Sequence, residues 1–416
     1  MEKSNIELDI TTQNLYRLPW NLADNAISWL EPTSKCNLYC DGCYRENRND
    51  SHKSLDEIKR ELEIFKSMRK SDSVSIAGGE PLMHPDIIEI VRLVKNMGWK
   101  PVINSNGELL TMDLLRKLKS AGVFGFTFHI DSGQGRAHWK GKTELELNEL
   151  RLKLADMLYD VGDLSCAFNL TVYPENIKYV PQLVKWAQDH IDRVHIMVFI
   201  IYRIAVRNSE FDYYVGGQKL TFEEVPYSVE NEERRTDVTS LEVVDEIRKY
   251  EPDFRPSAFL NGTHKVNSFK WLLTGRLGNK HQIFGYVGPR FMEIVQSVKH
   301  IFTDKYLAYA ETKLNRRGRS YFWLSFFDKG VWNACKTYFK SIITNPLAFF
   351  SKVHFQSIMI IQPTDILKNG DMNMCDGCPD ISIYDGDLVW SCRMEEMYKY
   401  DQWARAVVKD KHEITN

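Results

Sequence analysis

The sequence has no uninterrupted apolar run long enough to span a bilayer. The best candidate, "VHIMVFIIYRIAV", is short and carries Arg203, whereas a transmembrane helix needs roughly 20 predominantly apolar residues. The first ten residues, "MEKSNIELDI", are acidic and polar, which is not the pattern of a signal peptide. Internal repeats and low-complexity tracts are also lacking. These absences predict a cytoplasmic protein.

Cysteine is scarce and unevenly distributed. The 416 residues include only eight cysteines, yet three of them, Cys36, Cys40 and Cys43, fall within eight residues. Cytoplasmic thiols stay reduced, so clustered cysteines there more often bind metal than form disulfides. The spacing C-x3-C-x2-C therefore predicts a metal site.

The chain as a whole has nearly equal numbers of positive and negative charges, because a basic region and an acidic remainder compensate each other. The formal net charge is −2. From Arg255 to Ile360, however, 16 Lys and Arg face only 4 Asp and Glu, and the same stretch contains 20 Phe, Tyr and Trp. This segment is basic and aromatic, while the rest of the chain is acidic.

From residue 26 to 200, strand-like and helix-like segments alternate. Residues 54–70 open with Ser54 and Glu57 at capping-box spacing, and residues 143–162 open with Thr143 and Glu146 in the same relation. Crossover helices between strands predict a parallel sheet with helices outside. The expected strands are 27–31, 73–77, 100–104, 124–130, 164–172 and 194–200.

Two of these strands are predicted to have a polar face. In a strand, alternate side chains point to the same side. The polar or small residues of the two faces are Thr127, His129 and Asp131 in one strand, and Ser165, Ala167, Asn169 and Thr171 in the other. A parallel sheet buried on both sides is normally apolar on both. We therefore expect either a solvent-exposed face or a partly closed barrel whose inner face holds a polar ligand.

The chemistry of the first cysteine set favours an iron–sulfur cluster. Structural zinc normally takes four closed ligands, and this loop offers three cysteines without a nearby fourth ligand. Three thiolates can instead hold three irons of a [4Fe-4S] cluster, which leaves one iron open.

At this point the sequence resembles the radical S-adenosylmethionine (radical SAM) superfamily. The motif of Cys36, Cys40 and Cys43, followed by Tyr44, lies after the first strand, and "AGGEP" (77–81) and "NSNG" (104–107) follow the next two strands. The resemblance covers roughly residues 26–200. It implies a partial (β/α)6 barrel and an enzyme whose catalytic cluster binds S-adenosylmethionine (SAM) at its open iron.

The resemblance also implies a reaction and a set of contacts. The reduced cluster would cleave SAM to a 5′-deoxyadenosyl radical that abstracts hydrogen from a substrate. A flavodoxin or ferredoxin-type protein would supply the electron. The residues that it places against the cofactor are Tyr44, Gly78, Gly79, Glu80, Ser105, Asn106, His129, Asp131 and Asn169.

A second cysteine set lies near the carboxyl end. Cys375, Cys378 and Cys392 are spaced C-x2-C-x13-C, which is similar to the auxiliary-cluster domains called Twitch and to the radical SAM cyclase of molybdenum-cofactor synthesis. We expect a second [4Fe-4S] cluster. A zinc knuckle completed by Asp376 or a distant residue, and a purely structural or unmetallated set of thiols, remain alternatives. The chain lacks the terminal Gly-Gly of that cyclase and carries an additional basic insert, so GTP is not the expected substrate.

The sequence predicts four parts: an N-terminal extension (1–25), the radical SAM core (26–200), a mostly helical basic and aromatic segment (201–360), and an auxiliary-cluster domain (361–416). The large apolar side chains of the third part favour a lipid-like or membrane-associated substrate and a peripheral position at the membrane. RNA or a peptide is an alternative substrate, with nucleic acid less favoured. A helical lid with solvated charges is the simplest structural alternative. A non-catalytic iron–sulfur or zinc scaffold is the alternative from another class.

Overall fold

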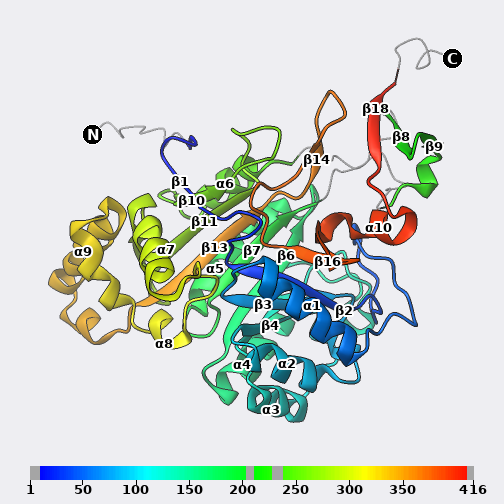
Figure 1. Ribbon diagram of the computed structural model, residues 1–416. Helices are drawn as coiled ribbons and strands as arrows, with labels where there is room; N and C mark the ends of the chain where they lie inside the picture. Colours follow the sequence, from blue (N-terminus) through cyan, green and yellow to red (C-terminus); the bar gives the residue numbers. More distant parts are fainter. Residues whose placement is uncertain (1–9, 203–209, 227–237, 410–416) are drawn as a thin grey trace.

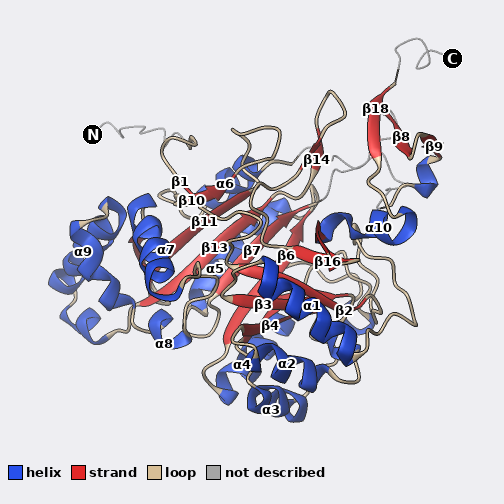
Figure 2. Ribbon diagram, viewed as in Figure 1, coloured by secondary structure: helices blue, strands red, loops and turns tan. Residues whose placement is uncertain are grey.

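A computed structural model describes residues 10–202, 210–226 and 238–409 of the chain. Parts of the expected N-terminal extension (1–9) and of the expected helical segment (203–209 and 227–237), together with residues 410–416, lie outside the described residues. Within the described ranges, the central element is an 11-stranded sheet. Figure 2 shows its strands as a continuous layer through the molecule.

Six parallel strands form the core of this sheet, and they occur where the sequence predicts them. They lie side by side in chain order, and every neighbouring pair is parallel. The strands are β2 (Ile27–Thr33), β3 (Ser73–Gly78), β4 (Lys100–Ser105), β5 (Gly125–His129), β6 (Ser165–Val172) and β7 (Ile196–Ile201). The predicted α/β fold class is confirmed.

Helices connect these strands. Helix α1 begins with a complete capping box, in which Ser54 accepts from the Glu57 backbone N–H and Glu57 accepts from the Ser54 backbone N–H. Its Ile58, Leu62 and Phe65 recur at helical spacing and are fully buried. The connecting helices are α1 (Leu55–Met68), α2 (Ile87–Asn96), α3 (Met112–Ala121), α4 (Asn148–Val161) and α5 (Val180–Asp189). In Figure 1, α2, α3 and α4 lie together below the sheet.

The second predicted capping box begins a turn rather than the helix itself. Thr143 and Glu146 form the reciprocal hydrogen bonds, but α4 begins only at Asn148. Glu144, in the intervening turn, is drawn into the interior by an ion pair with Arg151. This tertiary contact determines where the helix starts.

The sheet continues past β7 with strands from the second half of the chain. Strand β13 (His354–Ile361) pairs in parallel with β7, and β11 (Trp271–Gly278) pairs antiparallel with β13. The remaining strands of the sheet are β10 (Ala258–Leu260), β1 (Tyr16–Arg17) and β12 (Ile283–Tyr286). Segment 201–360 therefore contributes strands as well as helices. Its boundaries as a separate part stay a prediction.

The first helix of this segment packs against α5 and β13, and the later ones lie at one end of the sheet. The helices of the segment are α6 (Ser240–Arg248), α7 (Pro289–Thr303), α8 (Thr312–Asn315), and α9 (Lys329–Thr344), with the short 3-10 segments η5 (Gly318–Phe326) and η6 (Pro346–Phe350) beside α9. In Figure 1, α9 is the outermost element at the left edge. None of the helices in the described ranges is long and apolar enough to cross a membrane.

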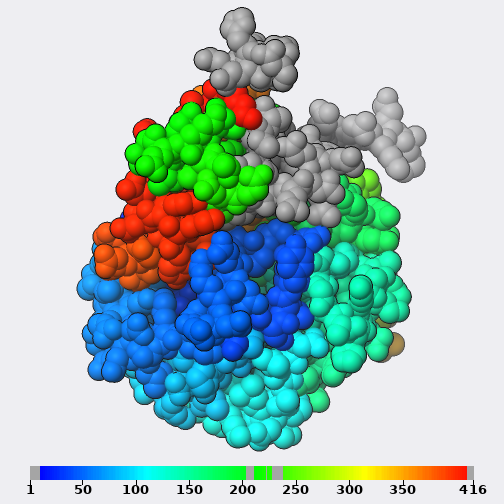
Figure 3. Space-filling view, turned by 90° about the vertical axis from the view of Figure 1, so that its right-hand side faces the viewer, coloured from blue at the N-terminus to red at the C-terminus, as the bar shows by residue number. Residues whose placement is uncertain are grey.

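The carboxyl-terminal residues form small sheets at the opposite end. A hairpin of β16 (Ile381–Tyr384) and β17 (Asp387–Trp390) turns at Asp385 and Gly386, both with positive φ, as a two-residue hairpin turn requires. The other elements are β14 (Asp365–Ile366), β15 (Met372–Asn373), α10 (Met394–Tyr400), and the sheet of β8 (Phe211–Val215), β9 (Gln218–Leu220) and β18 (Arg405–Val408). Figure 3 shows these orange and red residues directly beside the blue amino-terminal ones.

Candidate active site: a cavity between two cysteine sets

A large cavity of about 1760 Å³ lies between the parallel strands and the carboxyl-terminal residues. Both cysteine sets line it. So do all the predicted cofactor contacts except Asp131. The polar strand faces point into it through Thr127, His129, Asn169 and Thr171. Ser165, expected on the same face, is not at the cavity wall because it lies at the start of β6.

The first cysteine set lies in the loop between β2 and α1. Asn47 closes this loop, since its amide accepts from the Cys36 backbone N–H at 2.9 Å and donates to the Cys36 carbonyl at 2.8 Å. The Gln134 amide donates to the sulfur of Cys40 at 3.5 Å. The loop is thus fixed both at its own base and to the residues that follow β5.

Burial raises the pKa of all three thiols, and that of Cys40 to about 12. A thiol so disfavoured as an anion becomes a thiolate only beside a cation that compensates for the lost hydration. Three such thiols facing one cavity fit the donor set of an iron–sulfur cluster with one open iron. The residues present therefore fit the predicted catalytic cluster.

The glycines of "AGGEP" are required by close backbone packing. Gly78 has a φ of +103°, and a Cβ at this position would lie 2.3 Å from the Thr33 carbonyl oxygen. A Cβ at Gly79 would lie 2.3 Å from the Lys35 carbonyl oxygen. Both contacts are shorter than any side chain tolerates. The glycines bring this turn directly against the cysteine loop.

Glu80 connects this turn to the next motif. It is buried, and it accepts hydrogen bonds from the backbone N–H of Leu82 (3.0 Å), the hydroxyl of Ser105 (2.8 Å) and the backbone N–H of Asn106 (2.7 Å). Burial raises its pKa, although these hydrogen bonds oppose that shift. Asn106 in turn donates to the side-chain oxygen of Asn37 at 2.8 Å. Glu80 therefore acts as an internal brace between the motifs.

Asp131 lies behind the cavity wall rather than in it. Its carboxylate bonds to the His129 ring at 2.7 Å and accepts from the Thr171 backbone N–H at 3.0 Å and the Gly133 backbone N–H at 2.9 Å. Burial disfavours the anion, but the bonds from His129 and Thr171 outweigh it and lower the pKa of Asp131. The carboxylate orients His129, and its direct contact with a cofactor stays a prediction.

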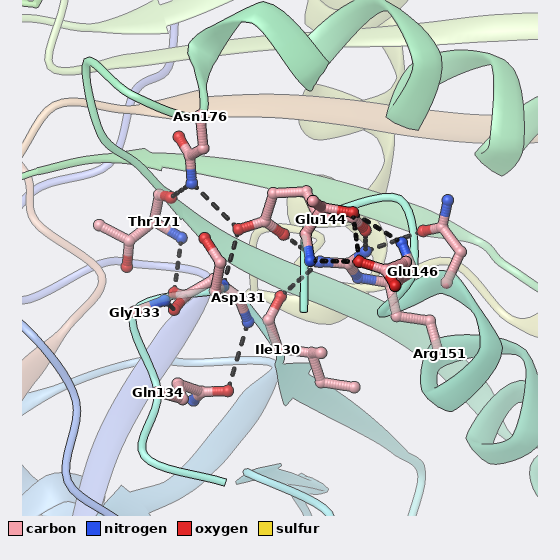
Figure 4. Close-up of polar contacts among 12 residues, drawn as sticks. Ile130, Asp131, Gly133, Gln134, Glu144, Glu146, Arg151, Thr171 and Asn176 are labelled. Atoms are coloured by element: carbon pink, nitrogen blue, oxygen red, sulfur yellow. Dashed lines mark hydrogen bonds and ion pairs between the residues drawn. The ribbon is translucent and has the colours of Figure 1, made fainter. Parts of the chain in front are cut away.

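A buried ion pair lies beside the loop after β5 and supports it, as Figure 4 shows. Glu144 and Arg151 are both fully buried and bond at 2.6 Å. Glu144 also accepts from the backbone N–H of Ser132 at 2.7 Å and from the Asn176 amide at 3.0 Å. Arg151 donates to the carbonyl of Ile130 at 2.7 Å. The pair thus holds the backbone on both sides of Asp131.

Within the described residues, several buried polar atoms at the cavity wall have no hydrogen-bond partner. They include the side-chain nitrogen of Asn104 and the side-chain oxygen of Asn169, and also the Trp20 indole nitrogen and the Thr127 hydroxyl oxygen. A buried polar group without a partner is costly. One free donor and one free acceptor on the polar inner face suit a polar ligand such as SAM.

The second cysteine set lines the same cavity. Cys375 and Cys378 are buried, and the hydrogen bond between their thiols lowers the pKa of Cys375 and raises that of Cys378. The buried Lys270 ammonium further favours the Cys375 thiolate. Burial raises the pKa of Asp380, beside them, to about 7. Cys392, also at the wall, follows β17.

The carboxyl-terminal residues are hydrogen-bonded onto the core. Arg69 donates to the carbonyl of Cys378 at 2.9 Å, and Arg45 donates to that of Ser391 at 2.6 Å. Arg48 pairs with the buried Glu395 at 2.5 Å. Because Arg45 and Arg48 directly follow the first cysteine motif, these contacts fix the second cysteine set relative to the first.

Sequence reasoning missed several of these residues. Gln134 and Arg136 hold the loop after β5, and Arg136 donates to the carbonyls of Asn106 (2.7 Å) and His129 (3.0 Å). Gln134 lies between the two glycines of "SGQGR" and Arg136 follows the second. This glycine-rich stretch at the end of a strand with a polar face was the available signal. Tyr309 and Asp380 also line the cavity, but they come from segments whose placement no local pattern specifies.

Comparisons with known proteins agree with this geometry. Residues 30–187 match the sequence model of the radical SAM superfamily. The chain carries a radical SAM domain. This domain runs from β2 to α5 and contains the first cysteine set, the glycine turn and the loop after β5.

Curated relatives match mainly this radical SAM domain. An AdoMet-dependent heme synthase of Methanosarcina barkeri is 29% identical over 170 residues, which is 40% of this chain and 48% of the relative. A tungsten-containing aldehyde ferredoxin oxidoreductase cofactor-modifying protein of Pyrococcus furiosus is 34% identical over 108 residues, 25% of this chain and 30% of the relative. A probable GTP 3′,8-cyclase of Methanocaldococcus jannaschii is 28% identical over 177 residues, which is 40% of this chain and 57% of the relative. The chain therefore spans about half the length of these relatives, or less.

Among solved structures, SuiB of Streptococcus suis bound to its precursor peptide SuiA aligns with 56% of this chain and 46% of its own, at 18% identity and a TM-score of 0.40.

Proposed function

We propose that this protein is a radical SAM enzyme that abstracts hydrogen from a weakly polar, lipid-like substrate. The observation that carries the proposal is that both cysteine sets, Cys36, Cys40 and Cys43 and Cys375, Cys378 and Cys392, line one cavity. A substrate between the two sets would be enclosed by protein. Such enclosure keeps a reactive radical away from water and stray hydrogen donors.

The first cysteine set would hold the catalytic [4Fe-4S] cluster. With SAM bound, the reduced cluster supplies the electron that cleaves SAM to methionine and a 5′-deoxyadenosyl radical. The protein's own residues orient the cosubstrate. The Gly78–Gly79 turn exposes its backbone beside the cluster loop, and the unpartnered amide atoms of Asn104 and Asn169 offer a donor and an acceptor. His129, held by Asp131, offers a ring edge on the same wall.

The substrate class is inferred from another part of the cavity wall. There β7, β13 and α7 contribute mainly apolar side chains: Ile196, Val198, Ile200, Phe291, Met292, Val295, Phe355 and Met359. Charged groups on this wall are few, so a strongly ionic substrate would lose hydration without compensation. A lipid or isoprenoid chain suits it better than RNA. A modified peptide is the second candidate, since an apolar side chain would also fit.

The second cysteine set would hold an auxiliary [4Fe-4S] cluster. All three thiols line the cavity wall, and Lys270 lies close enough to favour the Cys375 thiolate. An open iron would face the substrate, whereas a fourth protein ligand would make the cluster an electron relay. The external electron donor would be a flavodoxin or a ferredoxin.

Metal and sulfide analysis after anaerobic reconstitution tests the cofactor content. We expect about eight irons with matching sulfide per chain, as two [4Fe-4S] clusters require. The variant C375S/C378S/C392S should lose about half the iron and still cleave SAM, but it should form no product. The matched control is Cys166→Ala, which removes a thiol buried in the core and away from the cavity.

The same analysis separates the enzyme from a non-catalytic scaffold. Zinc without sulfide would support the scaffold and contradict the proposal. Unchanged iron in the triple variant would contradict the auxiliary cluster alone and leave the catalytic cluster standing.

A further inference from the structure

The outermost part of the molecule exposes many large apolar side chains. The helical lobe, defined as residues 318–350, consists of η5, α9 and η6. Trp323, Phe326, Ile343 and Phe350 are each about four-fifths exposed (79–82%). The other exposed apolar side chains of the lobe are Phe327, Trp332, Phe339, Leu347 and Phe349. Scattered surface apolar residues need no explanation, but a concentration such as this one marks an interaction site.

Helix α9 has two apolar stripes, and only one of them is used inside the protein. Val331, Ala334, Cys335 and Tyr338 are buried, and α9 packs on this side against the rest of the lobe and β12. A second stripe, at i, i+7 and i+11, is formed by Trp332, Phe339 and Ile343, and all three are exposed. The folded chain therefore leaves one apolar face of the helix without a partner in the described residues.

The charges around this face are of one sign. Between Thr312 and Lys352 the chain has eight Lys and Arg and one acidic residue, Asp328. Asp328 is buried, where it accepts from the backbone N–H groups of Gly288 and Val331. Lys336 lies between the residues of the exposed stripe, with its ammonium 5.8 Å from the Trp332 ring centroid. The face thus presents aromatic and aliphatic side chains with cations and no exposed carboxylate.

The interior of the lobe leads directly to the cavity. Phe291 and Phe355 line the cavity, and both rings contact Tyr321 of η5, at centroid distances of 5.5 and 5.1 Å. Met292 and Val295 of α7 belong both to the cavity wall and to the apolar cluster under α9. A continuous apolar path therefore connects the lobe with the candidate active site.

We propose that the helical lobe docks this protein on the surface of an anionic lipid bilayer. Aromatic and aliphatic side chains would enter the headgroup region while the lysines and arginines meet lipid phosphates. RNA would use the cations and stack on the rings, but Ile343 and Leu347, both largely exposed, would gain nothing from it. The docking would bring the apolar side chains between the lobe and the cavity close to the bilayer, although it does not depend on the proposed reaction.

Vesicle flotation of the full chain tests this surface without cluster or SAM. Vesicles of phosphatidylcholine with phosphatidylglycerol should carry the protein upward, and vesicles of phosphatidylcholine alone should carry far less. The variant W323S/F326S/F350S should partition at least about tenfold more weakly. K336Q/K340Q should lose roughly fivefold for each lysine removed, and raised salt should mimic it.

The matched control is I301S/F302S at the end of α7. These side chains are as exposed as those of the lobe (77% and 81%) but lie outside it, so flotation should stay unchanged. Because all substituted residues are exposed, unchanged thermal melting will verify folding. The proposal is overturned if the parent protein does not float with anionic vesicles, or if the triple variant floats equally well. It is also overturned if the lobe instead mediates a dimer in light scattering, or salt-sensitive tRNA binding that displaces vesicles.

Discussion

Removing the arginine of the buried Glu144–Arg151 pair should strongly destabilise the loop beneath the candidate SAM site. In Arg151→Met, the Glu144 carboxylate stays buried and keeps only its bonds from Ser132 and Asn176. The carbonyl of Ile130 also loses its bond from Arg151. Breaking one partner of a buried pair typically costs about 3–5 kcal/mol. We expect a loss of that size, since both side chains are fully buried.

The assay is urea unfolding of the variant and the parent protein, followed by amide hydrogen exchange of residues 130–136. Exchange should accelerate most at Ser132, whose N–H bonds to Glu144. The control is Arg92→Met, which removes the partner of Glu89 from a half-exposed pair. Surface ion pairs contribute about 0–1 kcal/mol, so Arg92→Met should lower the free energy of unfolding only slightly. The reasoning is refuted if Arg151→Met costs no more than Arg92→Met, or if exchange of the loop is unaltered.

Three further predictions concern other parts of the molecule. Burial lowers the pKa of His195 to about 4, so the folded state resists protonation, and stability should fall as pH drops from about 6.5 to about 4. In His195→Asn, the free energies of unfolding by urea at pH 5 and pH 7 should differ less than in the parent protein, and an unchanged difference would contradict this. Because the pKa of Cys40 is raised to about 12, iodoacetamide should label it slowly at pH 8 in the metal-free protein and faster as pH rises; fast labelling at pH 8 would be inconsistent with its burial. Glu395→Gln should loosen the contact with Arg48 and raise protease cleavage between residues 391 and 409, and a digestion pattern identical to the parent protein would count against a docking role for that pair.

The parallel core could be predicted from the sequence because the signals for its helices and strands lie within a few neighbouring residues. Ser54 and Glu57 predict the start of α1 from four residues, and the hairpin turn at Asp385 and Gly386 is equally self-contained. The polar face of β5 and β6 could be read from alternation alone. Thr143 shows the limit of this reasoning, since its capping box forms and yet the ion pair of Glu144 delays the helix.

Long-range pairing could not be predicted. Strand β13 joins the core sheet beside β7 across more than 150 residues of chain, and no local pattern specifies such a partner. For the same reason Asp131 was expected at the cavity wall, whereas its hydrogen bonds to two backbone N–H groups turn it behind His129. The exposed aromatic face could be predicted only in part. The sequence shows its composition, but only the fold shows which apolar stripe of α9 stays exposed.

The most direct test of the central claim is reductive cleavage of SAM. The reconstituted protein, reduced with dithionite without oxygen, should convert SAM to 5′-deoxyadenosine and methionine, as measured by chromatography. Cys40→Ala should abolish this, because one of three cluster ligands is lost, while Cys335→Ala, outside the cavity wall, should cleave SAM like the parent protein. Cleavage by Cys40→Ala at the parental rate, or none by the fully loaded parent protein, would contradict the account.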